Sequence, residues 1–227
     1  MALTKVTKEL IGDTDLTISG GTVDNSVIGG TTAAAGSFTT LSASSTLTLG
    51  GAAAKVAGKE TIWIPATAIY PNTTDGCSEL TQVALGSNKP DVKVLDFADG
   101  ASKLAQFTVA FPKSWNEGTV TFQPFWMVTG TNTGTVAWGL TGRSVASTDP
   151  AAVAFPSHVL TTALAFTGTS NDVMVSAESG TLTITDAGVG TVTFFQIKRD
   201  HTADTQTGDA RLLGLKLFFT TDAANDA

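Results

Sequence analysis

The side chains best suited to chemistry are few in this 227-residue chain and lie far apart. The two histidines, His158 and His201, have no metal-ligand spacing to each other or to Cys77, the single cysteine. A serine–histidine–aspartate site is assembled by the fold, but no nucleophile-elbow motif supports one here. We therefore expect no catalytic residue, no metal site and no cofactor.

The carboxylates also lack a pattern that points to catalysis. Glycoside hydrolysis needs two acids held a few ångströms apart. The acids of this chain lie mostly at the ends of expected strands, where a solvated turn is the simpler interpretation: Asp91, Asp96, Asp99, Glu117, Asp149, Asp172, Glu178 and Asp186. The Asp13–Asp15 stretch is too short for a calcium loop, and the sequence has no phosphate loop or dinucleotide fingerprint. We expect a protein that is not an enzyme.

Two short stretches carry the residue types of a sugar-binding patch. Trp115, Asn116 and Glu117 combine an aromatic ring for stacking with an amide and an acid for hydrogen bonding. Tyr70 and Asn72 form a second stretch of this kind. The alternative is that the tryptophan folds back to cap the core and the Asn-Glu-Gly run builds a turn. These five residues are the candidate ligand-binding residues, with a glycan or a host surface as the expected ligand.

The central element expected to position them is residues 103–128. Its apolar residues recur with the period of two that is typical of a strand with one buried face: Ala105, Phe107, Val109 and Phe111, then Val120, Phe122, Trp126 and Val128. Turn chemistry between Pro112 and Gly118 predicts a hairpin. Because proline cannot donate to a ladder, Pro124 predicts a bulge or an unpaired side in the second strand.

The remaining chain predicts an all-β fold. About ten short strands bounded by glycine, asparagine, aspartate or serine, with no convincing helix, indicate a jelly-roll-like antiparallel β-sandwich. Pro65 predicts an edge strand over residues 61–69, and the apolar residues of 212–219 predict a central strand covered on both sides. The hydrophobic content of 42% suffices for a sizeable core.

Residues 1–57 differ in kind from the rest of the chain. They contain no tryptophan, no tyrosine and a single phenylalanine, Phe38, and glycine pairs interrupt them. Such a segment cannot bury enough apolar surface to fold by itself. We therefore expect an extended Gly/Thr-rich arm, residues 1–57, that becomes ordered against identical copies or a partner. The β-sandwich is expected over residues 58–227.

Composition excludes several classes of partner. The net charge of −7 and the lack of a basic cluster argue against nucleic acid. The beginning of the chain has no apolar run that could serve as a signal peptide, and no stretch of membrane-spanning length is free of polar residues. We expect a protein that folds in a cytosol and does not insert into a membrane.

Parts of the sequence resemble virion proteins of tailed bacteriophages. The phrase Asp24–Leu41 and the opening Met1–Val6 are similar to segments near the N-terminal ends of phage fibre and spike proteins. The phrases Phe111–Thr121 and Asp209–Phe218 resemble structural domains in phages of marine and freshwater bacteria. The resemblance implies a structural, non-enzymatic and frequently trimeric protein, and it transfers no binding residues.

The expected function is therefore that of a short fibre or spike in the virion, assembled in the host cytoplasm. Its arm would attach to other virion proteins, three copies would form a homotrimer, and the sandwich would face outward to contact a host-surface glycan. One alternative is a capsid decoration or head-fibre protein that stabilises the shell. Another is a polysaccharide-cleaving tailspike, against which the short length and the lack of a parallel β-helix repeat count.

Overall fold

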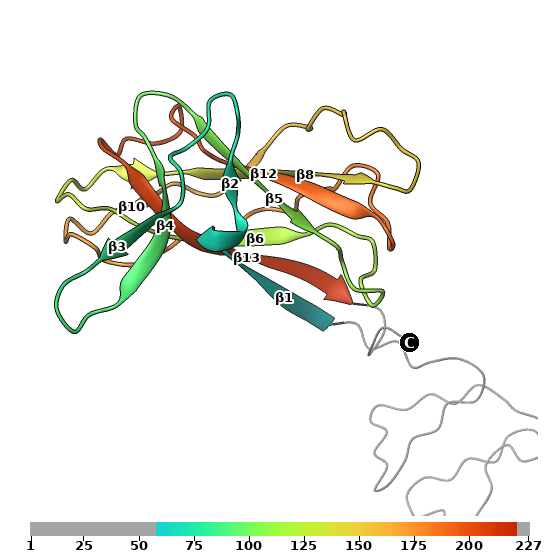
Figure 1. Ribbon diagram of the computed structural model, residues 1–227, viewed down its shortest axis with the longest axis horizontal. Coiled ribbons are helices and arrows are strands. Elements are labelled where there is room, and N and C mark those ends of the chain that lie inside the picture. The colour runs from blue at the N-terminus through green and yellow to red at the C-terminus, as the bar shows by residue number, and fades with distance from the viewer. Residues whose placement is uncertain (1–57, 222–227) are drawn as a thin grey trace, which may run out of the picture. The chain divides into compact units, whose positions relative to one another are not determined.

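A computed structural model describes residues 58–221, so our expectations for the arm, residues 1–57, lie outside the described residues. Within that range there are thirteen strands and one short 3-10 helix, η2 (Ala66–Ala68) (Figure 1). The strands are β1 (Gly58–Pro65), β2 (Tyr70–Pro71), β3 (Thr81–Ala84), β4 (Asp91–Phe97), β5 (Lys103–Val109), β6 (Thr121–Met127), β7 (Thr135–Val136), β8 (Trp138–Val145), β9 (Val159–Leu160), β10 (Leu164–Ala165), β11 (Met174–Val175), β12 (Val192–Arg199) and β13 (Ala210–Thr221). No helix among these residues is long and apolar enough to cross a membrane.

The strands form two main sheets, and neighbouring strands within each sheet are antiparallel. The first sheet has the order β11-β6-β13-β4-β3, with β1 also paired to β13. The second has the order β2-β5-β12-β8-β9, and β10 and β7 form a small third sheet. The two main sheets share one hydrophobic core. The predicted all-β, jelly-roll-like antiparallel sandwich is confirmed.

Strand β13 is the centre of the first sheet, as its apolar pattern predicted, but only one of its faces is fully buried and the other is half-buried. It pairs with β1 along its second half and with β6 on its other side, and its first residues pair with β4. A bulge lies in β13 between Leu212 and Gly214, opposite Phe125, one residue from the proline that predicted an irregularity. Gly214 has a φ of 150°, and a Cβ there would lie 2.5 Å from the carbonyl oxygen of Ile64. The predicted edge strand is β1, whose one strand partner among residues 58–221 is β13.

The predicted hairpin over residues 103–128 is wrong. The apolar residues of both strands are buried, but β5 pairs with β2 and β12, whereas β6 pairs with β11 and β13. The two strands therefore belong to different sheets and face each other across the core. The eleven residues 110–120 between them exceed the two to five residues typical of a hairpin loop, and they carry Phe111 and Trp115 into the core.

Candidate functional site

The structure contradicts the expectation that Trp115 presents its ring to a ligand. The side chain is only 2% exposed and stacks on Phe111 with 4.1 Å between ring centroids. The backbone N–H of Trp115 donates to Pro112, and the residue bridges to Thr221 at the end of β13. The physical reason is burial of a large aromatic surface, which outweighs the polar character of the surrounding turn. Trp115 therefore caps the core.

Asn116 and Glu117 hold the turn that follows. Asn116 donates its backbone N–H to Thr220, and its side-chain oxygen accepts from the N–H of Gly118 at 3.0 Å. Glu117 has a φ of 57°, and its Oε1 accepts from the N–H of Val189 at 2.6 Å. Both polar side chains are thus engaged in loop structure, as the alternative interpretation of this stretch predicted.

Tyr70 has the exposure that a stacking residue needs. Its side chain is 47% exposed on β2, at the edge of the second sheet. Asn72 is half-buried: its backbone N–H donates to Leu104, and its side-chain oxygen is buried without a hydrogen-bond partner in the described structure. Because Trp115 bridges to β13 in the first sheet, the five predicted residues do not form one patch. Of these residues, Tyr70 remains the candidate.

Tyr70 is one end of a row of side chains across the outer face of the second sheet. It pairs with Gln106 of β5, which pairs with Gln196 of β12, and paired residues share a face. Their sheet neighbours Phe107 and Phe195 are buried on the opposite face, so the two glutamines point outward. Within residues 58–221 neither glutamine amide has a hydrogen-bond partner. We call Tyr70, Gln106 and Gln196 the outer row.

The loop 146–158 builds a wall beside the outer row. Thr141 Oγ1 donates to the carbonyl of Pro156 at 3.0 Å, and Arg143 donates to the carbonyl of Ala154 at 3.3 Å. These bonds fold the loop back over the outer face of β8. Between the loop and the sheet lies a hollow of about 170 Å³, lined by Gln106, Arg143, Ala151, Val153, Phe155 and Phe194. The outer row and this hollow together are the candidate site.

The charges around the hollow are compensated. The guanidinium of Arg143 forms an ion pair with Asp186, with 2.9 Å between Nη2 and Oδ2. A second hollow of about 320 Å³ adjoins the first, and Asp149 and Asp186 line it together with Arg143. The site therefore offers aromatic rings, two free amides and apolar walls, but no unpaired cation. This chemistry suits an uncharged polar ligand with apolar faces.

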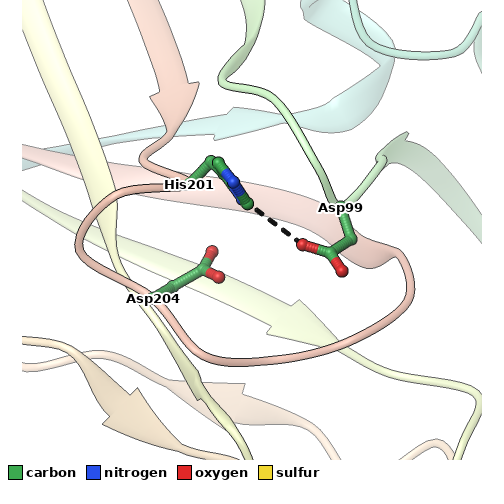
Figure 2. A group of neighbouring side chains, drawn as sticks. All are labelled: Asp99, His201 and Asp204. Carbon is green, nitrogen blue, oxygen red and sulfur yellow. Dashed lines mark ion pairs between the residues drawn. The ribbon is translucent and has the colours of Figure 1, made fainter.

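A separate group of polar side chains lies between β4 and the loop that follows β12. Asp99, His201 and Asp204 offer ligand atoms within 4.8 Å of one another, a spacing that could hold a metal ion (Figure 2). Asp204 is already bound, however, because both of its oxygens accept from Arg199, at 2.6 and 3.2 Å. The same guanidinium lies 3.8 Å from Asp99. A fixed cation therefore neutralises these carboxylates, and we assign no metal site here.

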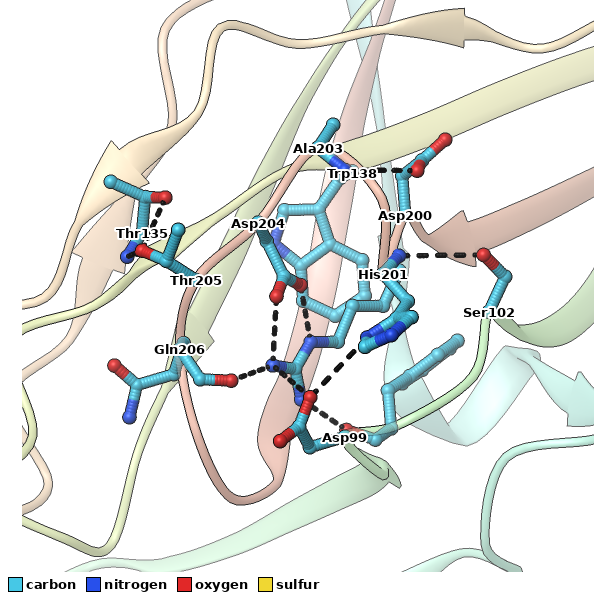
Figure 3. A network of polar contacts seen from close by, with 12 residues as sticks. Asp99, Ser102, Thr135, Trp138, Asp200, His201, Ala203, Asp204, Thr205 and Gln206 are labelled. Carbon is cyan, nitrogen blue, oxygen red and sulfur yellow. Dashed lines mark hydrogen bonds and ion pairs between the residues drawn. The ribbon is translucent and has the colours of Figure 1, made fainter.

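Arg199 instead anchors the loop between β12 and β13. Its side chain is buried, and all five guanidinium N–H groups find acceptors: the carboxylate of Asp204 and the carbonyls of Phe97, Gln206 and Gly208. Figure 3 shows Asp204 and Gln206 on one side of this network and Asp99 on another. The next residue, Asp200, accepts from the hydroxyl and N–H of Thr202 and pairs with Lys198. Burial opposes ionisation of Asp200, but the bonds from Lys198 and Thr202 outweigh it and lower its pKa to about 2. This network has a structural role.

The thiol of Cys77 and the imidazole of His158 lie in surroundings that do not favour reactivity. Burial raises the pKa of the Cys77 thiol to about 12, so a reactive thiolate is not formed near neutral pH. Burial, followed by the charge of Lys198, lowers the pKa of His158 to about 4, which keeps that imidazole neutral. Neither side chain lines the hollow.

Sequence reasoning missed the two glutamines and the exposed tryptophan. The alternation of β5 could have placed Gln106 on the solvent side, because its neighbours Ala105 and Phe107 are both apolar. It gives no sign that Gln196, ninety residues later, lies beside it. The exposed tryptophan is Trp63 of β1, 46% exposed, on the other sheet. The loop wall had no local signal either.

Comparisons with known proteins add little on function. No family model and no curated protein matches the chain. The solved structures that are similar to it include the following three. The CBM36-1 domain of a multidomain xylanase from the hindgut metagenome of Trinervitermes trinervoides has 12% identity and a TM-score of 0.37, covering 70% of this chain and 96% of that one. A carbohydrate-binding module specific for non-crystalline cellulose, CBM28, has 10% identity and a TM-score of 0.36, covering 71% and 89%. The family 11 carbohydrate-binding module from Clostridium thermocellum has 6% identity and a TM-score of 0.34, covering 74% and 90%. At these values the likeness carries no inference about a ligand of this chain.

Proposed function

We propose that the sandwich is a non-catalytic glycan-binding module and that the whole chain is a structural protein of a phage virion, a short fibre or spike. The observation that carries the binding proposal is the outer row: an exposed tyrosine beside two amides without partners, at the edge of a preformed hollow. A sugar ring has apolar C–H faces that pack on an aromatic ring, and hydroxyls that bond to amides.

The size of the row fits a ligand larger than one sugar ring. Tyr70 and Gln196 are two strand spacings apart, which is about 10 Å at about 4.8 Å for each spacing. The hollow extends the site on the side of Phe194 and Phe155. An oligosaccharide segment that stacks on Tyr70 and follows the row therefore meets Gln106, which also lines the hollow, and then Gln196.

The virion role is supported by the resemblance of the sequence to phage proteins. In this proposal residues 1–57 attach the protein to other virion proteins, three copies form a homotrimer, and the sandwich faces the host surface. Both phrases that resemble phage domains enter the folded core: Phe111–Thr121 links the two sheets, and Asp209–Phe218 contains most of the central strand β13.

Binding is tested with the full-length chain on an array of bacterial envelope polysaccharides. Tyr70→Ala and Gln106→Ala should each reduce retention at least tenfold while leaving the thermal unfolding midpoint near that of the parent. Trp63→Ala is the matched control, because it removes an equally exposed aromatic ring from the other sheet. Retention that is lost with Trp63→Ala and kept with Tyr70→Ala would refute the assigned face.

Two further measurements separate the alternatives. Labelling of the protein on intact particles should give a few copies at the tail. Many copies across the shell would instead favour the decoration or head-fibre role. Because Asp149 and Asp186 line one hollow, the retained polysaccharide should also be incubated with the protein. Release of shorter chains that Asp186→Asn abolishes would establish a cleaving tailspike and overturn the non-catalytic proposal.

A further inference from the structure

The hollow beside the outer row has a composition more specific than that of a general sugar-binding surface. Four of its lining residues are apolar: Ala151, Val153, Phe155 and Phe194. Its volume of about 170 Å³ is close to that of a cavity of about 150 Å³ that accepts benzene, so a group of several heavy atoms fits. A sugar hydroxyl placed against these walls would lose its water without gaining a partner. A methyl group would not.

The polar groups that line the hollow indicate which chemical group should carry this methyl group. Gln106 has a side-chain amide without a hydrogen-bond partner among residues 58–221, and it can both donate and accept. An acetamido substituent offers a carbonyl that accepts, an N–H that donates and a terminal methyl group. Its amide would pair with Gln106 at the rim, and its methyl group would lie between Phe155 and Phe194.

The charges exclude an acidic sugar as the preferred ligand. Among residues 58–221 Arg143 is the only cation that lines the hollow, and its charge is paired with Asp186, while its other terminal nitrogen donates to the carbonyl of Ala154. Asp149 adds a further negative charge in the adjoining hollow. A carboxylate or sulfate would therefore have to compete with Asp186 for Arg143, and it would approach a chain of net charge −7.

We infer that the ligand of this site is an uncharged oligosaccharide that carries an N-acetyl group, and that this group occupies the hollow while the adjacent ring stacks on the outer row. The inference rests on the glycan binding proposed above. It assigns the hollow as the part of the site that determines specificity.

The test uses the envelope polysaccharide that the full-length chain retains most strongly on the array. It is N-deacetylated chemically, and separate portions are then N-acetylated again or N-formylated. Deacetylation should weaken binding at least tenfold, and renewed acetylation should restore it. The N-formyl product keeps a neutral amide but lacks the methyl group, so it should bind about fourfold more weakly than the acetylated one, the value of one buried methyl group.

Variants connect this preference to the hollow. Val153→Phe should fill the hollow and remove the advantage of the acetylated over the formylated polysaccharide, whereas Tyr70→Ala should weaken both by the same factor. Should Val153→Phe fail to fold, Ala151→Leu serves in its place. Equal binding before and after deacetylation, a retained polysaccharide without acetamido sugars, or a preference for a deoxysugar methyl group would overturn the inference while leaving glycan binding intact. Retention of no polysaccharide would overturn both proposals.

Discussion

Replacement of Arg199 by methionine is the sharpest test of the network that anchors the loop after β12. Arg199→Met keeps the apolar stem of the side chain but removes all five donors. The carboxylate of Asp204, whose side chain is 1% exposed, would then be buried without a cation. Removal of one partner from a buried ion pair costs about 3–5 kcal/mol, a large part of the stability of an ordinary domain.

The free energy of unfolding is measured by urea titration with tryptophan fluorescence as the probe. Lys59→Met is the matched control, because it breaks an ion pair at the surface. The side chain of Lys59 is 53% exposed and that of its partner Glu178 is 38% exposed, so the free energy of unfolding should change by less than about 1 kcal/mol. Adding Asp204→Asn to Arg199→Met removes the stranded charge, so the double variant should be more stable than the single one. A loss below about 1 kcal/mol for Arg199→Met would refute the assignment of this network as an anchor.

Three further predictions concern buried groups. The pKa of His158 is about 4 in the folded chain and about 6.5 in the unfolded chain. Because the unfolded state binds the proton first as the pH falls, the free energy of unfolding should decrease between about pH 6.5 and 4. His158→Leu should reduce this decrease, which is measured by urea titrations at pH 7 and 4.5. The carboxyl of Asp200 has its folded pKa lowered to about 2, so its contribution is present above about pH 4 and lost toward pH 2; Asp200→Asn should be less stable at pH 7 and lose less of its stability over that window. Trp115→Ala should cost about 3–5 kcal/mol because the ring is buried against Phe111, and a thermal midpoint equal to that of the parent would show that the ring does not support the core.

The strands and their buried faces could be predicted because alternation is a local property. Phe107 and Val109 in β5, and Leu215 and Leu217 in β13, are buried as their period of two requires. The same holds for the edge position of β1, since Pro65 limits pairing wherever the strand lies. These conclusions need no knowledge of which strands become neighbours.

Strand partners could not be predicted in the same way. Strands β5 and β6 are adjacent in sequence and have matching apolar faces, which satisfies both a hairpin and a sandwich whose sheets face each other. The choice is made by β12, which pairs with β5 from Thr193↔Val109 to Arg199↔Lys103, and by β13, which pairs with β6. Strands β12 and β13 lie far along the chain, and the sequence of residues 103–128 does not indicate how they pair with it.

In the candidate site too, local features could be predicted from the sequence and contacts between distant strands could not. Tyr70 could be identified because an aromatic residue next to proline and asparagine indicates a surface turn, and it is exposed. Trp115 stands in similar surroundings, but it is close enough to the end of β13 to bury its ring. Gln106 and Gln196 meet only because their strands pair. Turn composition predicts a loop, whereas the direction of its large side chain depends on whether core surface lies within reach.

The way the loop 146–158 is attached bears on how the hollow would work. Thr141 and Arg143 project from β8, a strand held on both sides by β12 and β9, and they bond to the carbonyls of Pro156 and Ala154. The wall is therefore tied to the rigid sheet, and the hollow exists before a ligand arrives. A ligand that enters need not order the loop, so less of the gross interaction energy is spent on conformational entropy. Loss of either bond should then weaken binding even though neither hydroxyl nor guanidinium need touch the sugar, which makes Thr141→Val the variant that separates a preformed hollow from a loop that closes on its ligand.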